Sequence, residues 1–347
     1  MLLIALTLIG LPSAAVSSIL SATNAARTVP YGIVLHGGDC GVTQVVRGVS
    51  GFHDGVIELA LEQYIYAAAV NFAGRVYIFG GSPHKDASHP VRTTQIYDPL
   101  TNSTSVGAPM SVGRSLHSAV REGDAIVVCG GKSDSSRILS SCETYWPFED
   151  RWDENMPNNM PAGVHSHGSA MLKNKGNMRV TLSVANRLAS NGRFQCAGLF
   201  VFGGHTASGR TSAVYSWNYW QFWQRQWPMK QPRADFSFAV LDGDVVVCGG
   251  VYEPDEAVSS CELLDEYSGT WSQYTPMAVA RHHHRMVTFA GNTYLIGGYD
   301  SFVGNATDTM ELYQPTSNSS WTTWEKLDVP CAGFVAFTMG DPTRESC

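Results

Sequence analysis

Glycine pairs recur at the ends of six short apolar strands, and this repeat constrains the fold more than any other feature of the chain. The pairs end at Gly38, Gly81, Gly131, Gly204, Gly250 and Gly298, so the intervals are 43, 50, 73, 46 and 48 residues. A repeat of about 40 to 50 residues that contains an apolar strand is typical of a β-propeller blade. Almost the whole sequence is therefore one repeated unit.

Further landmarks recur at fixed distances from the glycine pairs. An arginine lies 16 residues before the first glycine in three repeats, with a methionine four residues before it; the arginines are Arg114, Arg233 and Arg281. Alternating residues and a Gly-containing turn then predict an inner strand and a second strand. A Tyr and a later Trp mark the outer strands. These landmarks resemble the kelch repeat over about residues 31–341, which implies an all-β, six-bladed kelch-type propeller.

The ends of the repeat array predict how the ring closes. The first blade begins at its second strand, YGIVLHGG, whereas the C-terminal segment FVAFTMGD aligns with the inner strands of other blades. Residues 334–338 should therefore pair with residues 33–36 and leave no free sheet edge. The fourth blade has Val164 at the arginine position and a polar insertion at about residues 173–194 between its first two strands.

Several features predict a secreted protein. Residues 1–26 carry no charge and contain the run LLIALTLIGL, which fits a signal peptide, with the propeller at residues 27–347. An uncleaved anchor is the alternative, but the run is too short for a stable membrane span. Asn102, Asn305 and Asn318 are N-glycosylation acceptors. The net charge of −7 argues against a nucleic-acid partner. The predicted localisation is extracellular.

The eight cysteines indicate disulfides, in keeping with an oxidising compartment. Cys129 and Cys142 are 13 residues apart, as are Cys248 and Cys261, and each pair spans the end of strand two and the start of strand three. We predict one disulfide within each of these blades. A third bond, between Cys40 and Cys331, would lock the ring. Two cysteines remain, Cys196 and Cys347, which either pair or stay available as free or intermolecular thiols.

One face of the predicted ring gathers candidate ligand-binding residues. The loops between strands two and three share this face with the starts of the inner strands. The candidates are Arg114, Arg233 and Arg281 with the loop residues His84, His89, His205, Arg137 and Arg210. Arginines around one mouth could clamp a carboxylate, sulfate or phosphate. The alternative is that arginines recurring at one register serve the blade itself.

Histidine pairs suggest a second kind of site. His165 and His167 stand two apart, as do His282 and His284, so strand alternation could turn each pair toward one metal ion. The alternative is that histidines sharing a register are structural. Galactose oxidase is also an extracellular enzyme with kelch-type blades, but it has seven of them, and no motif carries its copper ligands over. We therefore predict no metal and no other cofactor.

No catalytic motif is recognisable, so binding is favoured over catalysis. The leading hypothesis is a secreted, glycosylated propeller that binds an extracellular protein or glycan, for example in the extracellular matrix. One alternative is a secreted metal-dependent oxidase of the galactose-oxidase type that acts on carbohydrate. The other is an extracellular filament or coat subunit cross-linked through Cys196 or Cys347. The oligomeric state does not follow from the sequence.

Overall fold

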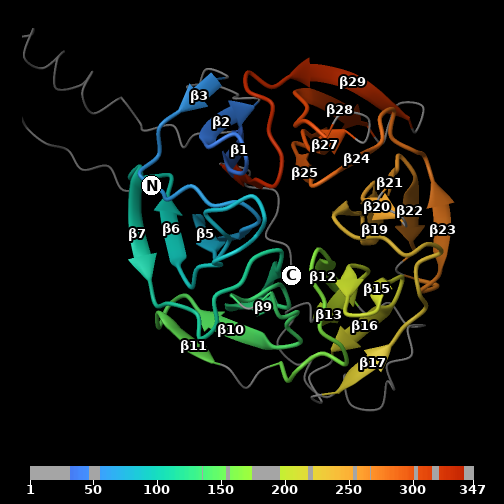
Figure 1. Cartoon of the computed structure of the whole chain (residues 1–347), viewed down its shortest axis with the longest axis horizontal. Helices are drawn as coiled ribbons and strands as arrows, with labels where there is room; N and C mark the ends of the chain where they lie inside the picture. The colour runs from blue at the N-terminus through green and yellow to red at the C-terminus, as the bar shows by residue number, and fades with distance from the viewer. Residues whose placement is uncertain are drawn as a thin grey trace, which may run out of the picture.

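The computed structural model forms a closed ring of six four-stranded antiparallel sheets around a central channel (Figure 1). It describes residues 32–46, 55–134, 136–153, 157–173, 196–217, 222–252, 256–265, 267–300, 304–314 and 320–339. These residues form strands and turns without any helix, so none of them belongs to a helix able to cross a bilayer. The all-β, six-bladed architecture predicted from the glycine repeat is confirmed.

Blade 1 joins the last strand of the chain to the first three, whereas blades 2 and 3 each use four consecutive strands. From the channel outward, blade 1 consists of β30 (Val335–Met339), β1 (Gly32–Gly37), β2 (Val42–Val46) and β3 (Gly55–Ile57). Blade 2 consists of β4 (Ala68–Phe72), β5 (Arg75–Phe79), β6 (Thr94–Asp98) and β7 (Ser103–Gly107). Blade 3 consists of β8 (Ser118–Glu122), β9 (Ala125–Cys129), β10 (Cys142–Trp146) and β11 (Arg151–Asp153).

The other three blades have the same order. Blade 4 consists of β12 (Gly168–Lys173), β13 (Cys196–Phe202), β16 (Val214–Trp217) and β17 (Trp223–Arg225). Blade 5 consists of β18 (Ser237–Leu241), β19 (Asp244–Cys248), β22 (Cys261–Leu264) and β23 (Trp271–Tyr274). Blade 6 consists of β25 (Arg285–Phe289), β26 (Asn292–Ile296), β28 (Thr309–Tyr313) and β29 (Trp321–Lys326).

The ring closes as predicted. Strand β30 pairs with β1 in an antiparallel register that places Thr338 opposite Ile33 and Val335 opposite His36. The insertion in blade 4 also lies where expected, because Lys173 and Cys196 pair across its base. The intervening residues 174–195 lie outside the described residues.

The core lies between the blades. Along β1, Ile33 and Leu35 pack against blade 6, whereas Val34 packs against Val76 and Ile78 of blade 2. Both faces of each inner pair of strands are thus buried, which explains why these strands are continuous apolar runs rather than alternating ones. Each blade depends on both neighbours for its burial.

The glycine pairs allow adjacent blades to approach closely. The first glycine meets the next blade: a Cβ at Gly130, where φ is +67°, would lie 2.4 Å from the carbonyl oxygen of Val164. The second glycine, Gly131, donates its backbone N–H to that same oxygen at 2.9 Å. Because the backbone must pass at this distance and with positive φ, only glycine fits.

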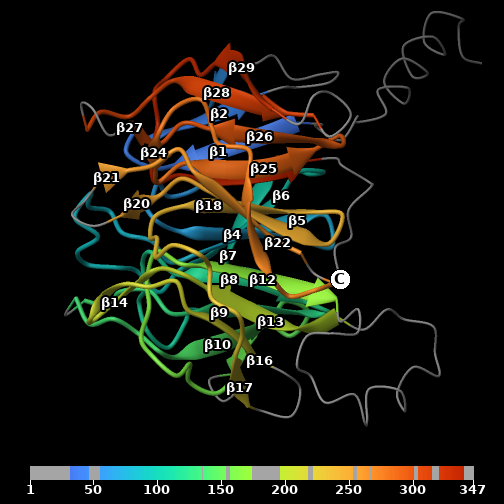
Figure 2. The same cartoon turned by 90° about the vertical axis from the view of Figure 1, so that its right-hand side faces the viewer.

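Short two-stranded sheets lie on one face of the ring, the left side in Figure 2. Two are hairpins, β14 (His205–Thr206) with β15 (Gly209–Arg210) and β20 (Val251–Tyr252) with β21 (Glu256–Ala257); the third pairs β24 (Arg281–His282) with β27 (Tyr299–Asp300). We call this side the mouth face. It carries the loops between strands two and three and the starts of the inner strands.

Candidate functional site

The three repeated arginines are buried inside their blades. Arg114, Arg233 and Arg281 are each 0% exposed. Arg233 donates to the carbonyl oxygens of Gly249 and Ser260, both at 2.9 Å, and to Glu262 at 2.8 Å. Arg281 repeats this arrangement with Glu311, and Arg114 with Glu143. This burial favours the structural role over the ligand clamp also considered from the sequence.

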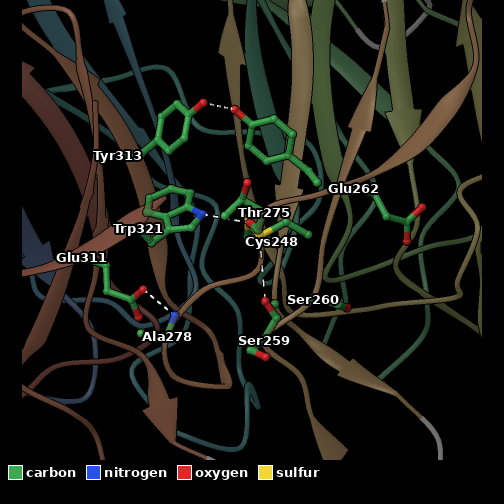
Figure 3. The surroundings of a disulfide bond; sticks show 12 residues. Cys248, Ser259, Ser260, Glu262, Thr275, Ala278, Glu311, Tyr313 and Trp321 are labelled. Atoms are coloured by element: carbon green, nitrogen blue, oxygen red, sulfur yellow. Dashed lines mark hydrogen bonds between the residues drawn. A yellow bond between two sulfur atoms is a disulfide. The ribbon is translucent and has the colours of Figure 1, made fainter. Parts of the chain in front are cut away.

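Each blade that contains the repeated arginine also contains a glutamate that pairs with it. Glu311 also accepts the backbone N–H of Ala278 at 2.7 Å, a contact visible in Figure 3. Blades 1 and 2 lack the arginine, with Cys331 and Tyr64 in its place, and there the acid is replaced by Gln44 and Gln95. Those amides accept the equivalent backbone N–H without bringing a buried charge. A carboxylate is thus present only where a buried guanidinium pairs with it.

Three disulfides brace the blades, with the pairing predicted from the sequence. Cys129 bonds Cys142, and Cys248 bonds Cys261, each joining strands two and three of one blade. Figure 3 shows the second of these beside Glu262. Cys40 bonds Cys331 and ties blade 1 to the segment before β30. Cys347 lies outside the described residues, so the partner of Cys196 stays a prediction.

A ring of backbone hydrogen bonds encircles the channel at the mouth face. It contains one residue from each blade, two positions after the arginine register, and we call it the collar: Tyr66, Leu116, Ser166, Asp235, His283 and Gly333. Each N–H donates to the carbonyl oxygen of the preceding blade's collar residue at 2.8 to 3.1 Å, and the N–H of Tyr66 donates to Gly333. All six residues have φ between 53° and 66°. Sequence reasoning missed the collar, because its six positions share no residue type.

Two neighbouring collar residues, His283 and Asp235, carry ionisable side chains that contact each other. His283 Nε2 lies 3.0 Å from Asp235 Oδ1. Burial alone would raise the pKa of Asp235, but the charge of His283 and hydrogen bonds from His283 and Ser166 hold it well below its usual range. The neighbouring ring of Tyr66 lies 4.9 Å from that of His283. Burial, together with the charges of Asp235 and Asp39, raises the pKa of Tyr66 to about 12.

The four histidines considered as metal ligands have separate environments. His165 stacks on His205 at 5.0 Å, and His282 contacts the ring of Tyr299. His167 hydrogen-bonds Ser118 at 2.8 Å, and His284 is fully buried. Across the described ranges, no group of three or more His, Cys, Asp or Glu side chains could hold a metal ion.

The loop candidates lie on the mouth face. His84, His89 and Arg137 are exposed, whereas His205 and Arg210 are half-buried and pair across the β14–β15 hairpin. Charge is divided across this face. Blades 2 to 4 supply the cations Lys85, Lys132, Arg137 and Arg210, against Asp86 and Asp134. Blades 5, 6 and 1 supply Glu256, Asp300, Asp308 and Asp39, of which Asp39 is 8% exposed beside Lys85 and Asp308 pairs with Lys326. Their loops at residues 249–260, 297–308 and 38–41 contain no Lys or Arg.

The channel holds a cavity of about 230 Å³ next to the collar. Its walls are the starts of the inner strands, and they include the side chains of Ser118, Ser169, Ser237 and Arg285. Arg285 was not among the sequence candidates. A cavity of this size is smaller than the roughly 300–1,000 Å³ typical of sites for drug-sized ligands.

Comparison with known proteins agrees with this architecture. The Kelch motif family matches residues 232–278 and 280–323. Beta-scruin of Limulus polyphemus is 26% identical over 283 residues, covering 78% of this chain and 29% of the scruin. Alpha-scruin of the same organism is 25% identical over 291 residues, covering 79% and 29%. The match thus spans less than a third of these relatives' own length.

Two further matches point the same way. Kelch-like protein 34 of Homo sapiens is 25% identical over 232 residues, covering 64% of this chain and 33% of that protein. The solved structure of YjhT aligns with a TM-score of 0.62 over 86% of this chain and 98% of its own length. At 14% identity that likeness concerns the fold alone. Fold and blade geometry define a six-bladed β-propeller. The Kelch motif in blades 5 and 6 and these relatives agree with the kelch repeats expected from the sequence.

Proposed function

We propose that this kelch-repeat propeller is a secreted module that binds an extracellular protein through its mouth face. The divided charge of that face carries the proposal. Complementary charge steers association and selects orientation, and a surface with one basic and one acidic half specifies a partner's orientation as well as its location. Kelch relatives commonly bind proteins, which supports this choice.

A protein partner is favoured over a glycan because of where the exposed aromatic residues lie. Sugar-binding surfaces use aromatic rings for stacking. Phe148, Phe222 and Tyr267 are 76%, 68% and 64% exposed, but they lie between strands three and four, on the side opposite the mouth; Trp227, which is 59% exposed, follows the outermost strand of blade 4. The mouth face instead offers Lys85, whose side chain is 68% exposed, with Arg137 and Glu256.

Charge reversal tests the binding face. Lys85→Glu with Arg137→Glu alters the basic half, and Glu256→Lys alters the acidic half. Arg151→Glu is the matched control, because Arg151 is 51% exposed at the opposite end of blade 3. Extracellular proteins captured by the wild type are identified, and the affinity of each purified candidate is measured. At least tenfold weaker binding by both mouth variants, with the control unchanged, supports the proposal. Equal affinity for all variants contradicts it.

Secretion and glycosylation form the other part of the proposal. The three disulfides suit an oxidising compartment. Asn102 and Asn305 are exposed in loops, as glycosylation requires, whereas Asn318 and residues 1–26 lie outside the described residues. Expression of the whole chain in animal cells should deliver it to the medium, with a glycosidase-sensitive mass that falls in Asn102→Gln and Asn305→Gln. Retention inside the cell without glycan would contradict this part alone.

A further inference from the structure

One register of the ring contains a single large side chain. Every inner strand begins four positions after the arginine register, at the residues Ala68, Ser118, Gly168, Ser237, Arg285 and Val335. All of these residues except Arg285 are small or apolar. All except Gly168 line the channel cavity. Blade 6 alone thus places a long cationic side chain where the other blades leave room. The repeat itself does not require an arginine here.

Arg285 is a partly buried cation without a directly bonded carboxylate among the described residues. Its Nη1 donates a hydrogen bond to the carbonyl oxygen of His284 at 3.3 Å. None of the carboxylates in the described part of the chain lies within 4.0 Å of its guanidinium in an ion pair. The nearby Asp235 is already engaged by His283 and Ser166. Burial lowers the pKa of Arg285 to about 10, so the side chain is still charged at neutral pH.

Two serines line the same cavity. Ser169 of blade 4 and Ser237 of blade 5 are 3% and 4% exposed, and both line the cavity with Arg285 of blade 6. Neither Oγ has a hydrogen-bond partner among the residues that the structure describes. The third hydroxyl, that of Ser118, already bonds His167 at 2.8 Å. Three adjacent blades therefore place a guanidinium and two serines without hydrogen-bond partners around one small space, and each buried Oγ would meet a ligand after a rotation about χ1.

This donor set has a definite chemical preference. A partly buried charge and buried hydroxyls cost free energy unless they find partners. A guanidinium offers parallel N–H groups that match two oxygens of a carboxylate or phosphate, and serine hydroxyls donate readily to remaining oxygens. We propose that the channel is a binding site for one compact oxyanion, held by Arg285 with Ser169 and Ser237. The site lies below the collar, and its ligand is independent of a protein bound at the mouth face.

Titration calorimetry with inorganic phosphate at constant ionic strength tests the site. The wild-type chain should bind one phosphate saturably. Arg285→Met should weaken binding at least tenfold, Arg285→Lys less, because charge remains without the fork, and Ser237→Ala severalfold. Arg75→Met is the control: it also removes one cation, but from a side chain that is 55% exposed on the outside. Removing a charge that has no ion-pair partner among the described residues should not unfold the protein, and circular dichroism is used to check that each variant is folded.

Parallel titrations with sulfate and acetate define the ligand class. Binding of phosphate and sulfate without acetate assigns the site to tetrahedral oxyanions, and acetate binding extends it to carboxylates. Absence of saturable binding for all three anions would overturn the proposal, as would equal affinities in Arg285→Met and Arg75→Met. The mouth variants Lys85→Glu and Arg137→Glu should bind phosphate like the wild type, which keeps this test separate from the partner-binding test.

Discussion

Arg233 and Glu262 form a completely enclosed ion pair at 2.8 Å, with side-chain exposures of 0% and 4%. Removing only the arginine leaves a carboxylate buried without its charge partner. We expect Arg233→Met to destabilise the chain by about 3–5 kcal/mol, measured by urea unfolding. The double variant Arg233→Met with Glu262→Leu should recover much of the loss. Arg75→Ala, which breaks an exposed pair, should cost under about 1 kcal/mol. An equal loss in both single variants would contradict this account.

The glycine pairs should tolerate no side chain. Gly130→Ala would place a Cβ 2.4 Å from the carbonyl oxygen of Val164, so the interface between blades 3 and 4 must open. Gly123 is the matched control, since its φ of +59° is similar but its Cβ would meet nothing within 4 Å. Gly123→Ala should cost roughly 1 kcal/mol for backbone strain alone. Thermal unfolding should show a clearly larger loss for Gly130→Ala. Similar losses would mean that backbone conformation, rather than blade contact, selects glycine.

The disulfide that closes the ring should matter most. Cys40–Cys331 spans 291 residues of sequence and Cys129–Cys142 spans 13. In the chain-entropy model, these loops correspond to about 6 and about 3 kcal/mol. Urea unfolding of the paired serine variants should follow this order, and hydrogen exchange in β30 should rise only when Cys40 and Cys331 are replaced. The reverse order would show that strand pairing alone closes blade 1.

Stability should fall in mild acid because of buried histidines. Burial lowers the pKa of both His165 and His167 to about 3, with the charge of Lys132 adding to the effect at His165. As pH falls, these histidines therefore bind protons in the unfolded chain before they do so in the folded one, because their pKa in the unfolded chain is about 6.5. Stability is complete above that pH and is lost as pH falls toward 3, at up to about 1.4 kcal/mol per unit for each histidine.

Substitution isolates one of these two histidines. In urea unfolding between pH 6.5 and 4, His167→Gln should show a slope smaller by up to about 1.4 kcal/mol per unit. Glutamine can keep a hydrogen bond to Ser118. His84→Gln is the control, because His84 is exposed on a loop. An unchanged slope in His167→Gln would show that this imidazole accepts a proton in the folded chain.

The repeat made the ring, its closure and its disulfides predictable, because register is visible in sequence spacing. Register does not reveal whether a side chain points to the surface or into the blade. The sequence was therefore equally consistent with a ligand-binding role at the mouth face and a buried structural role for Arg114, Arg233 and Arg281. The matching change from Glu to Gln at Gln44 and Gln95 was a readable sign of internal pairing. Arg285 becomes conspicuous only beside the small residues of the other inner strands. The collar had no sequence signal, since backbone atoms build it.

The pairing of β1 with β30 has a consequence during synthesis. While the ribosome is still translating, β1 and its neighbours emerge early, but the strand that must lie beside them is made only at residues 335–339. Until then the nascent chain presents an unpartnered sheet edge open to wrong pairings, and the bond between Cys40 and Cys331 cannot form. A chaperone or oxidoreductase that shields this edge would be needed longest for the part of the protein that is made first.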